Sequence, residues 1–160
     1  MSTAQRVPMT PTGNAKLKAA LKDFKEVQRP ANVLAIEEAR AHGDLRENAE
    51  YHAAKEKQAM IAAMISDIED KISRAEVVDP TTITSSRIQF GATVTLQDAD
   101  SDEEIVYKIV GGEEADAKVG LISYDAPLAR ALIGKEEGDT VRFDAPKGKK
   151  VFEVLSVTYK

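Results

Sequence analysis

The chain has 160 residues, of which 42% are hydrophobic and 31% charged, a balance typical of a folded globular protein and not of a disordered one. The absence of Cys excludes disulfides, thiolate zinc sites and a Cys nucleophile. No run approaches the roughly 18 apolar residues of a membrane span. The net charge of −5 argues against a broad basic face for duplex nucleic acid, and the N-terminus lacks the apolar core of a signal peptide, so we expect a cytoplasmic protein.

The two halves of the chain differ in composition. Residues 1–76 contain 12 Lys/Arg and 12 Asp/Glu and are neutral, whereas residues 77–160 carry the whole net charge and most of the Gly and aromatic residues. Pro80 prevents a helix from continuing past this point. We therefore predict an α+β protein of two domains, residues 1–78 and 79–160.

A long helix is predicted to begin after Thr10, whose hydroxyl can cap it, with Pro11 in its first turn. Pro30 should bend this helix, and Gly43 should end it in a left-handed conformation. Apolar and small residues at spacings of four and three predict a coiled-coil seam. The predicted seam residues are Leu17, Leu21, Phe24, Gln28, Ala31 and Ala35.

The second predicted helix returns along the first. Its seam runs backwards from Ala75 through four Ile residues to Gln58, Ala54 and Tyr51. A turn as short as Gly43-Asp44 would place the two helices side by side and antiparallel. Each helix of about 30 residues would span roughly 45 Å. The seam becomes Ala-rich toward the turn, which favours a slender end that enters a narrow space over a simple spacer or dimerisation arm.

Asp44 and Glu47 lie at the predicted tip, residues 43–47, within the sequence HGDLRENAEYH. In this D-x-x-E pattern Asp44 could cap the second helix and Glu47 could reach back to the cap. The same two carboxylates could instead be held out at the tip for use. The neighbouring His42 and His52 lack the further ligands that a metal site needs, so we assign them no metal.

The second half predicts five short strands, within residues 92–98, 103–111, 121–125, 139–146 and 149–160, which form a small antiparallel sheet. A short helix should run from Pro127 to Gly134. Its apolar residues either pack on the sheet or form an exposed docking surface. The candidate docking residues are Pro127, Leu128, Leu132 and Ile133. No phosphate-binding loop is present, so a nucleotide site is not expected.

Stretches of sequence from both halves of the chain resemble one known protein family. Residues 37–58, EEARAHGDLRENAEYHAAKEKQ, resemble the coiled-coil tip of bacterial transcript cleavage factors of the GreA/GreB family, closer to its GreA branch than to GreB. The stretches FGATVTL, DSDEEIVYKIVGGEEAD and LISYDAPLARALIGKEEGD resemble the C-terminal domain of the same family. The resemblance covers nearly the whole chain, residues 9–159. It implies a C-terminal domain with a fold like that of the FK506-binding proteins.

The resemblance also implies a function. The C-terminal domain would dock on the rim of the secondary channel of RNA polymerase, and the coiled coil would enter that channel. The tip acids, which correspond to Asp44 and Glu47, would stimulate the polymerase to cleave backtracked RNA. The chain would be no enzyme itself and would hold no cofactor tightly. Mg²⁺ would be shared with the polymerase, a role that suits carboxylate ligands. We expect no sequence-specific reading of DNA.

Four residues near the tip are further candidates for contact with polymerase or with the 3′ end of the RNA, which basic side chains would reach through its phosphates. Alternatively, Tyr51 packs in the seam, and the three basic residues belong to a solvent-exposed face. The four are Arg40, Arg46, Tyr51 and Lys55.

Three other functions fit the sequence less well. A related channel-entering regulator would inhibit polymerase without promoting cleavage, but the intact acidic pair favours cleavage. A peptidyl-prolyl isomerase would need an aromatic-lined pocket, and the chain has no Trp and only scattered aromatics. A purely structural coiled coil would not need a thinning tip.

Overall fold

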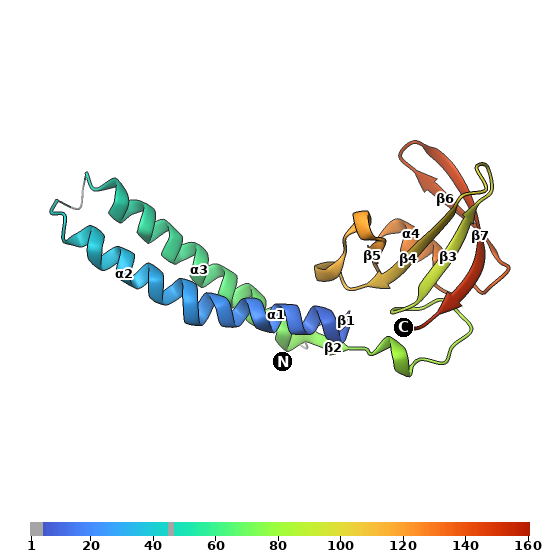
Figure 1. Ribbon diagram of the computed structural model, residues 1–160, viewed down its shortest axis with the longest axis horizontal. Helices are drawn as coiled ribbons and strands as arrows, with labels where there is room; N and C mark the ends of the chain where they lie inside the picture. Colours follow the sequence, from blue (N-terminus) through green and yellow to red (C-terminus); the bar gives the residue numbers. More distant parts are fainter. Residues whose placement is uncertain (1–4, 45–46) are drawn as a thin grey trace. The chain divides into compact units, whose positions relative to one another are not determined.

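The computed structural model describes residues 5–44 and 47–160. The chain divides into two compact units (Figure 1). One unit, residues 14–74, is a helical hairpin. The other combines residues 5–13 with residues 75–160 and contains a five-stranded sheet with a short helix. The predicted combination of a helical hairpin with a small α+β domain is therefore confirmed.

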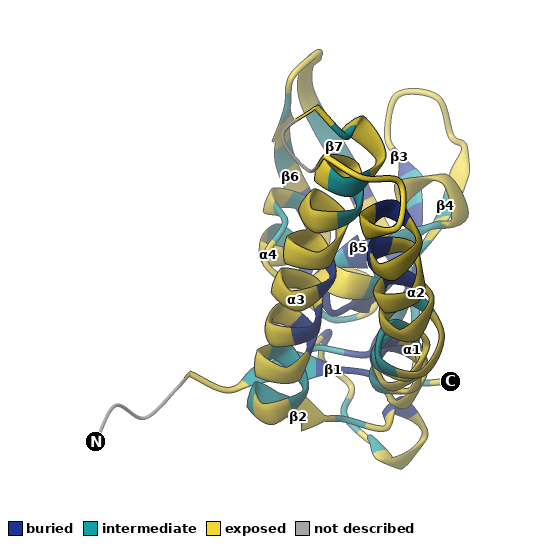
Figure 2. Ribbon diagram, turned by 90° about the vertical axis from the view of Figure 1, so that its left-hand side faces the viewer, coloured by how far each residue is buried: buried dark blue, intermediate teal, exposed yellow. Residues whose placement is uncertain are grey.

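The helical hairpin is built from α1 (Pro11–Asp23), a π-helical turn η1 (Phe24–Gln28), α2 (Arg29–Arg40) and α3 (Ala49–Arg74). Thr10 caps α1 as predicted, because its hydroxyl oxygen accepts a hydrogen bond from the backbone N–H of Gly13 at 3.2 Å. Helix α2 packs against α3, and Figure 2 shows that the buried residues of the two helices face one another. None of the described helices is long and apolar enough to cross a membrane.

The π-helical turn changes which face of α2 is buried. The backbone N–H of Arg29 donates to the carbonyl of Phe24, five residues earlier, so the turn holds one residue more than an α-helical turn. The seam beyond it is shifted by one position. The predicted seam residues Ala31 and Ala35 are exposed, and the buried residues are Asn32, Ile36 and Ala39. The prediction failed because a sequence pattern assumes a uniform helical period.

Helix α3 has the seam that the sequence predicts. Ile61, Ile65 and Ile68 are buried, and their spacing of four and three keeps them on one face of the helix. Toward the tip Ala54 and Tyr51 are half-buried on the same face, whereas Gln58 is exposed. Ala75 lies beyond the helix, in a short strand. Because Ile36 is buried opposite this end of α3, the distal seam is less Ala-rich than expected.

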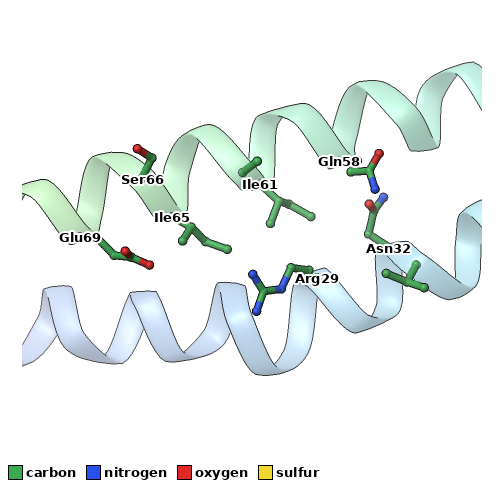
Figure 3. Close-up of a pocket in the computed structure, with 9 residues that line it drawn as sticks. Arg29, Asn32, Gln58, Ile61, Ile65, Ser66 and Glu69 are labelled. Carbon is green, nitrogen blue, oxygen red and sulfur yellow. The ribbon is translucent and has the colours of Figure 1, made fainter.

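Asn32 is a polar side chain within the seam. It is only 4% exposed, and its Nδ2 donates a 3.0 Å hydrogen bond to the backbone carbonyl of Ala54 on α3. It lines a pocket on one face of the hairpin together with Arg29, Gln58 and the other α3 residues that Figure 3 labels (Ile61, Ile65, Ser66 and Glu69). In Figure 3 its side chain points from α2 toward α3. A buried amide with one good partner fixes how two helices pair along their length.

The second unit contains a five-stranded sheet of strand order β5-β4-β3-β7-β6. Four strands lie within the predicted segments, and β7 begins one residue before its segment, at Gly148. Four of the five strands pair antiparallel, but β5 pairs parallel with β4, so the sheet is mixed and the prediction of a fully antiparallel sheet was wrong. The bounds are β3 (Thr93–Asp98), β4 (Glu104–Val110), β5 (Leu121–Ser123), β6 (Thr140–Ala145) and β7 (Gly148–Thr158).

The core of this unit lies between the sheet and the short helix α4 (Pro127–Leu132). Alternation along β3 buries Val94 and Leu96 completely, and Leu132 of α4 joins them in one hydrophobic cluster. The long segment between β4 and β5 forms two 3₁₀ turns, η3 (Gly112–Glu114) and η4 (Ala117–Val119). These turns allow β5 to run parallel to β4, which a tight hairpin could not.

Two short strands hold together the start and the end of the hairpin segment. β1 (Val7–Met9) pairs parallel with β2 (Ala75–Val77), and neither strand was predicted. The carboxylate of Glu114 accepts hydrogen bonds from the backbone N–H and the hydroxyl of Thr10. A further short helix, η2 (Pro80–Thr82), begins at Pro80, where Asp79 caps it.

The buried carboxylate of Asp98 ends β3. It accepts a 2.8 Å hydrogen bond from the backbone N–H of Asp100, a weaker one from Ser101, and a 3.2 Å bond from the Nζ of Lys150. These donors favour the ionised form, and they hold the pKa of Asp98 below its ordinary value, the Asp100 N–H contributing most. The acidic turn that follows β3 is thereby tied to β7.

Candidate functional site

The tip of the hairpin begins where α2 ends. The backbone N–H groups of His42 and Gly43 bond back to the carbonyls of Ala39 and Arg40, which tightens the last turn. Gly43 has a φ of +110°, a conformation that favours glycine, as the sequence predicted. The connection to α3 spans residues 41–48, so it is longer than the predicted two-residue turn.

Asn48, and not Asp44, caps helix α3. The Oδ1 of Asn48 accepts a 3.0 Å hydrogen bond from the backbone N–H of Tyr51, three residues on, which is the geometry of an N-cap. Helix α3 starts at Ala49, so Asp44 and Glu47 both precede it. The alternative in which these two acids form a capping box is therefore wrong.

Asp44 and Glu47 are both exposed, in the connection between the two helices. Mg²⁺ in proteins keeps several waters and takes one or two carboxylates, so two exposed carboxylates are ligands of the kind that it accepts. Within residues 5–44 and 47–160, no group of three or more His, Asp or Glu side chains could hold a metal ion. Two carboxylates alone cannot fill the coordination shell of Mg²⁺.

Several contacts link the two sides of the tip. The guanidinium carbon of Arg40 lies 5.9 Å from the centre of the Tyr51 ring, which suits a cation–π contact. The Nε2 of His42 lies 3.7 Å from an Oε atom of Glu50, with both side chains largely exposed. The Nδ2 of Asn48 donates a 2.6 Å hydrogen bond to the carbonyl of Ala39.

The remaining predicted tip residues are not all brought together. Lys55 lies farther along α3 and donates to the side chain of Gln58 at 2.8 Å on the exposed surface. His52 packs edge-on against the Tyr51 ring. Arg46 lies outside the described residues. Asn48 was not predicted as a tip residue, although Asn is as strong a cap as Asp.

The predicted docking helix is only partly available. Leu132 has no exposed surface, so it belongs to the core and cannot contact a partner. Leu128 is half-buried against the same core. Pro127 is exposed and Ile133 is 41% exposed, so these two residues present the apolar surface of the segment.

Comparison with known families covers both units of the chain. Residues 7–77 match the family described as "Transcription elongation factor, N-terminal". Residues 83–159 match the family described as "Transcription elongation factor, GreA/GreB, C-term". Together these matches leave only a few residues outside them.

Individual relatives agree with the family matches. The chain is 55% identical over 156 residues to the transcription elongation factor GreA of Hyphomonas neptunium, a match that covers 98% of this chain and 99% of the relative. It is also 55% identical to GreA of Francisella tularensis subsp. novicida, over 97% of this chain and 98% of the relative.

Solved structures give weaker matches. The GreA/GreB factor from Nitrosomonas europaea is 22% identical, with a TM-score of 0.43 over 98% of this chain and 100% of that one. The Gfh1 protein of Thermus aquaticus is 30% identical, with a TM-score of 0.44 over 97% of this chain and 99% of that one.

Proposed function

Because the chain belongs to the GreA/GreB family of transcription elongation factors, we propose that its tip acts in trans at the active site of RNA polymerase. There it stimulates the polymerase's own cleavage of backtracked nascent RNA. The observation that carries this proposal is the placement of Asp44 and Glu47. They are exposed at the end of a helical hairpin, while a different residue, Asn48, caps the helix that follows.

The two carboxylates would have complementary roles. Asp44 would contribute an oxygen ligand to a Mg²⁺ ion whose other ligands belong to the polymerase. Such an ion, when bound, stabilises charge on the phosphodiester and on the attacking oxygen. Glu47 would accept a hydrogen bond from the attacking water and orient it for in-line attack. Asn48 caps α3, so neither carboxylate is needed for that role.

The rest of the chain would deliver and orient this tip. The hairpin would enter the secondary channel, and the exposed Pro127 and Ile133 would contribute to docking on the channel rim. Arg40 and Lys55 are exposed near the tip, where they could contact RNA phosphates or polymerase. The partner would be a cytoplasmic polymerase.

The direct test uses polymerase stalled in a backtracked state with labelled RNA. Wild-type protein should shorten the RNA from its 3′ end. The Asp44→Asn and Glu47→Gln variants should still bind polymerase. Their stimulated cleavage rates should fall by about 100-fold or more, as expected for groups that act on the reacting atoms. Glu56→Gln neutralises an exposed acid on α3, nine residues along the chain from Glu47; it is the matched control and should behave as wild type.

Two outcomes would contradict the proposal. If both tip variants cleave as fast as wild type, the tip acids are not the functional groups. If wild-type protein slows the polymerase without shortening the RNA, the chain is an inhibitory regulator of the same channel.

A further inference from the structure

The side-chain amide of Asn48 bonds to both sides of the tip. Its Oδ1 accepts from the backbone N–H of Tyr51 in the first turn of α3, at 3.0 Å. Its Nδ2 donates to the carbonyl of Ala39 near the end of α2, at 2.6 Å. One side chain thus connects the last turn of one helix with the first turn of the next.

We propose that Asn48 is a positioning residue for the tip acids. Its bond across the connection holds Asp44 and Glu47 at the separation and orientation that their use requires. This inference rests on the proposed function of the tip. The residue does not itself touch substrate; it acts through the backbone that carries the two acids.

The location of Asn48 supports this role. It directly follows Glu47, and its acceptor Ala39 lies five residues before Asp44, so the bond closes the segment that contains both acids. Ala39 is only 2% exposed, and Asn48 is itself half-buried, so water competes for this hydrogen bond less than for a fully exposed one. A misplacement of about 1 Å in a catalytic group can lower a rate about 100-fold, so holding this segment matters for chemistry.

Two other contacts across the tip, among the described residues, are less able to hold it. The charges of His42 and Glu50 lie 3.7 Å apart, with side chains 66% and 77% exposed, and such surface pairs contribute little. The Arg40 guanidinium lies 5.9 Å from the centre of the Tyr51 ring, near the limit of about 6 Å for a cation–π contact. The hydrogen bond that the Asn48 amide donates is short and directional, and its acceptor is the backbone carbonyl of Ala39.

The side-chain amide of Asn48 accepts one hydrogen bond and donates the other, so substitutions can test the two hydrogen bonds separately. Asn48→Asp keeps an oxygen to cap α3 but replaces the donor toward Ala39 with a carboxylate oxygen. Asn48→Ser keeps a neutral cap of similar strength but is too short to reach across. Asn48→Ala loses both bonds. Helix content and thermal stability of the Asp and Ser variants should therefore stay near wild type.

The cleavage test uses the whole 160-residue chain with backtracked polymerase. We expect Asn48→Ser and Asn48→Asp to reduce the stimulated rate at saturating protein by about tenfold, without a change in affinity for polymerase. The Mg²⁺ concentration for half-maximal cleavage should rise, which a loss of helix stability alone would not cause. If the Ser variant matches wild type, or if only the Asp or only the Ala variant is defective, the inference is overturned.

A second measurement requires no cleavage and separates this inference from the proposed function. The chain has no Cys, so spin labels can be placed at Glu38→Cys and Ala53→Cys, two exposed positions on opposite sides of the tip. The distance distribution between the labels should broaden in Asn48→Ser. An unchanged distribution would overturn the inference even if wild type stimulates cleavage. A wild type that fails to stimulate cleavage would count against the proposed function alone.

Discussion

The π-helical turn Phe24–Gln28 predicts that the first half of the hairpin tolerates the loss of one residue at one position but not at another. Val27 lies in this turn and is 59% exposed, and Val33 lies beyond it and is 45% exposed. We compare deletion of Val27 with deletion of Val33, both in a Pro30→Ala background. The background is needed because a proline ring clashes with the carbonyl four residues earlier in a regular α-helix.

Deletion of Val27 should be nearly neutral. It would convert the π-helical turn into an α-helical one and leave Phe24 and Asn32 seven residues apart, which is one heptad. Asn32, Ile36 and Ala39 would keep their places in the seam. We expect a change of less than about 1 kcal/mol in the free energy of unfolding relative to Pro30→Ala alone.

Deletion of Val33 should be costly. It would rotate the rest of α2 by about 100°, so Glu37 would replace the buried Ile36. Burying Ile36 contributes about 1.5–3 kcal/mol, and placing a carboxylate in the seam adds to the loss. A loss of about 2 kcal/mol in a unit of this size lowers the melting temperature by about 8–16 °C.

Circular dichroism at a helical wavelength measures both variants, because the hairpin contains most of the helix. The expected result is a melting temperature near that of Pro30→Ala for the Val27 deletion and a much lower one for the Val33 deletion. Equal losses in the two variants would refute the reasoning, because the π-helical turn would then not be a removable single-residue insertion.

Two further predictions concern the sheet unit. Because folding lowers the pKa of Asp98, its ionised carboxylate stabilises the fold above the ordinary pKa of 3.8, and this contribution is lost as the pH falls through the lowered value. Asp98→Asn should therefore lower the thermal midpoint at pH 7, and the gap to wild type should close well below pH 3.8; a gap of equal size at both pH values would contradict this. Gly120→Ala should cost about 1–3 kcal/mol in urea unfolding, because Gly120 has a φ of +77° and an added Cβ would lie 2.6 Å from the carbonyl oxygen of Val106. Gly134→Ala, with a φ of +91° but open space around its Cβ, is the matched control and should cost less.

Those parts of the fold that depend on local patterns could be predicted from the sequence. The five strands follow from alternation of β-branched and apolar residues, and the α3 seam follows from Ile61, Ile65 and Ile68. The start of α1 follows from Thr10 and Pro11. Each of these patterns lies within a short stretch of sequence, so it could be predicted without knowledge of contacts to distant parts of the chain.

The features that the sequence did not predict all depend on contacts between segments that lie far apart in the chain. The π-helical turn is set by how α2 must face α3, and β1 and β2 are three-residue strands separated by 65 residues of chain. The direction of β5 is set by the folded segment before it. Each feature is stabilised by contacts that the local sequence does not specify.

The tip was predicted in position but not in detail. Asp44 and Asn48 are both good capping residues, so intrinsic preference could not choose between them. Asn48 can also donate a hydrogen bond to the carbonyl of Ala39, which an ionised Asp cannot do. The choice of cap was therefore decided by a bond to the other helix.

The pairing of β1 with β2 gives the hairpin a modular character. Its first residues follow one strand and its last residues precede the other, so both ends of a 61-residue insertion are held by the same two short strands. Seven residues added to each helix would lengthen the insertion by about 10 Å without a change at either strand. The length of the hairpin can thus change in matched steps of both helices, and the single extra residue of the π-helical turn shows how an unmatched step is absorbed within one helix.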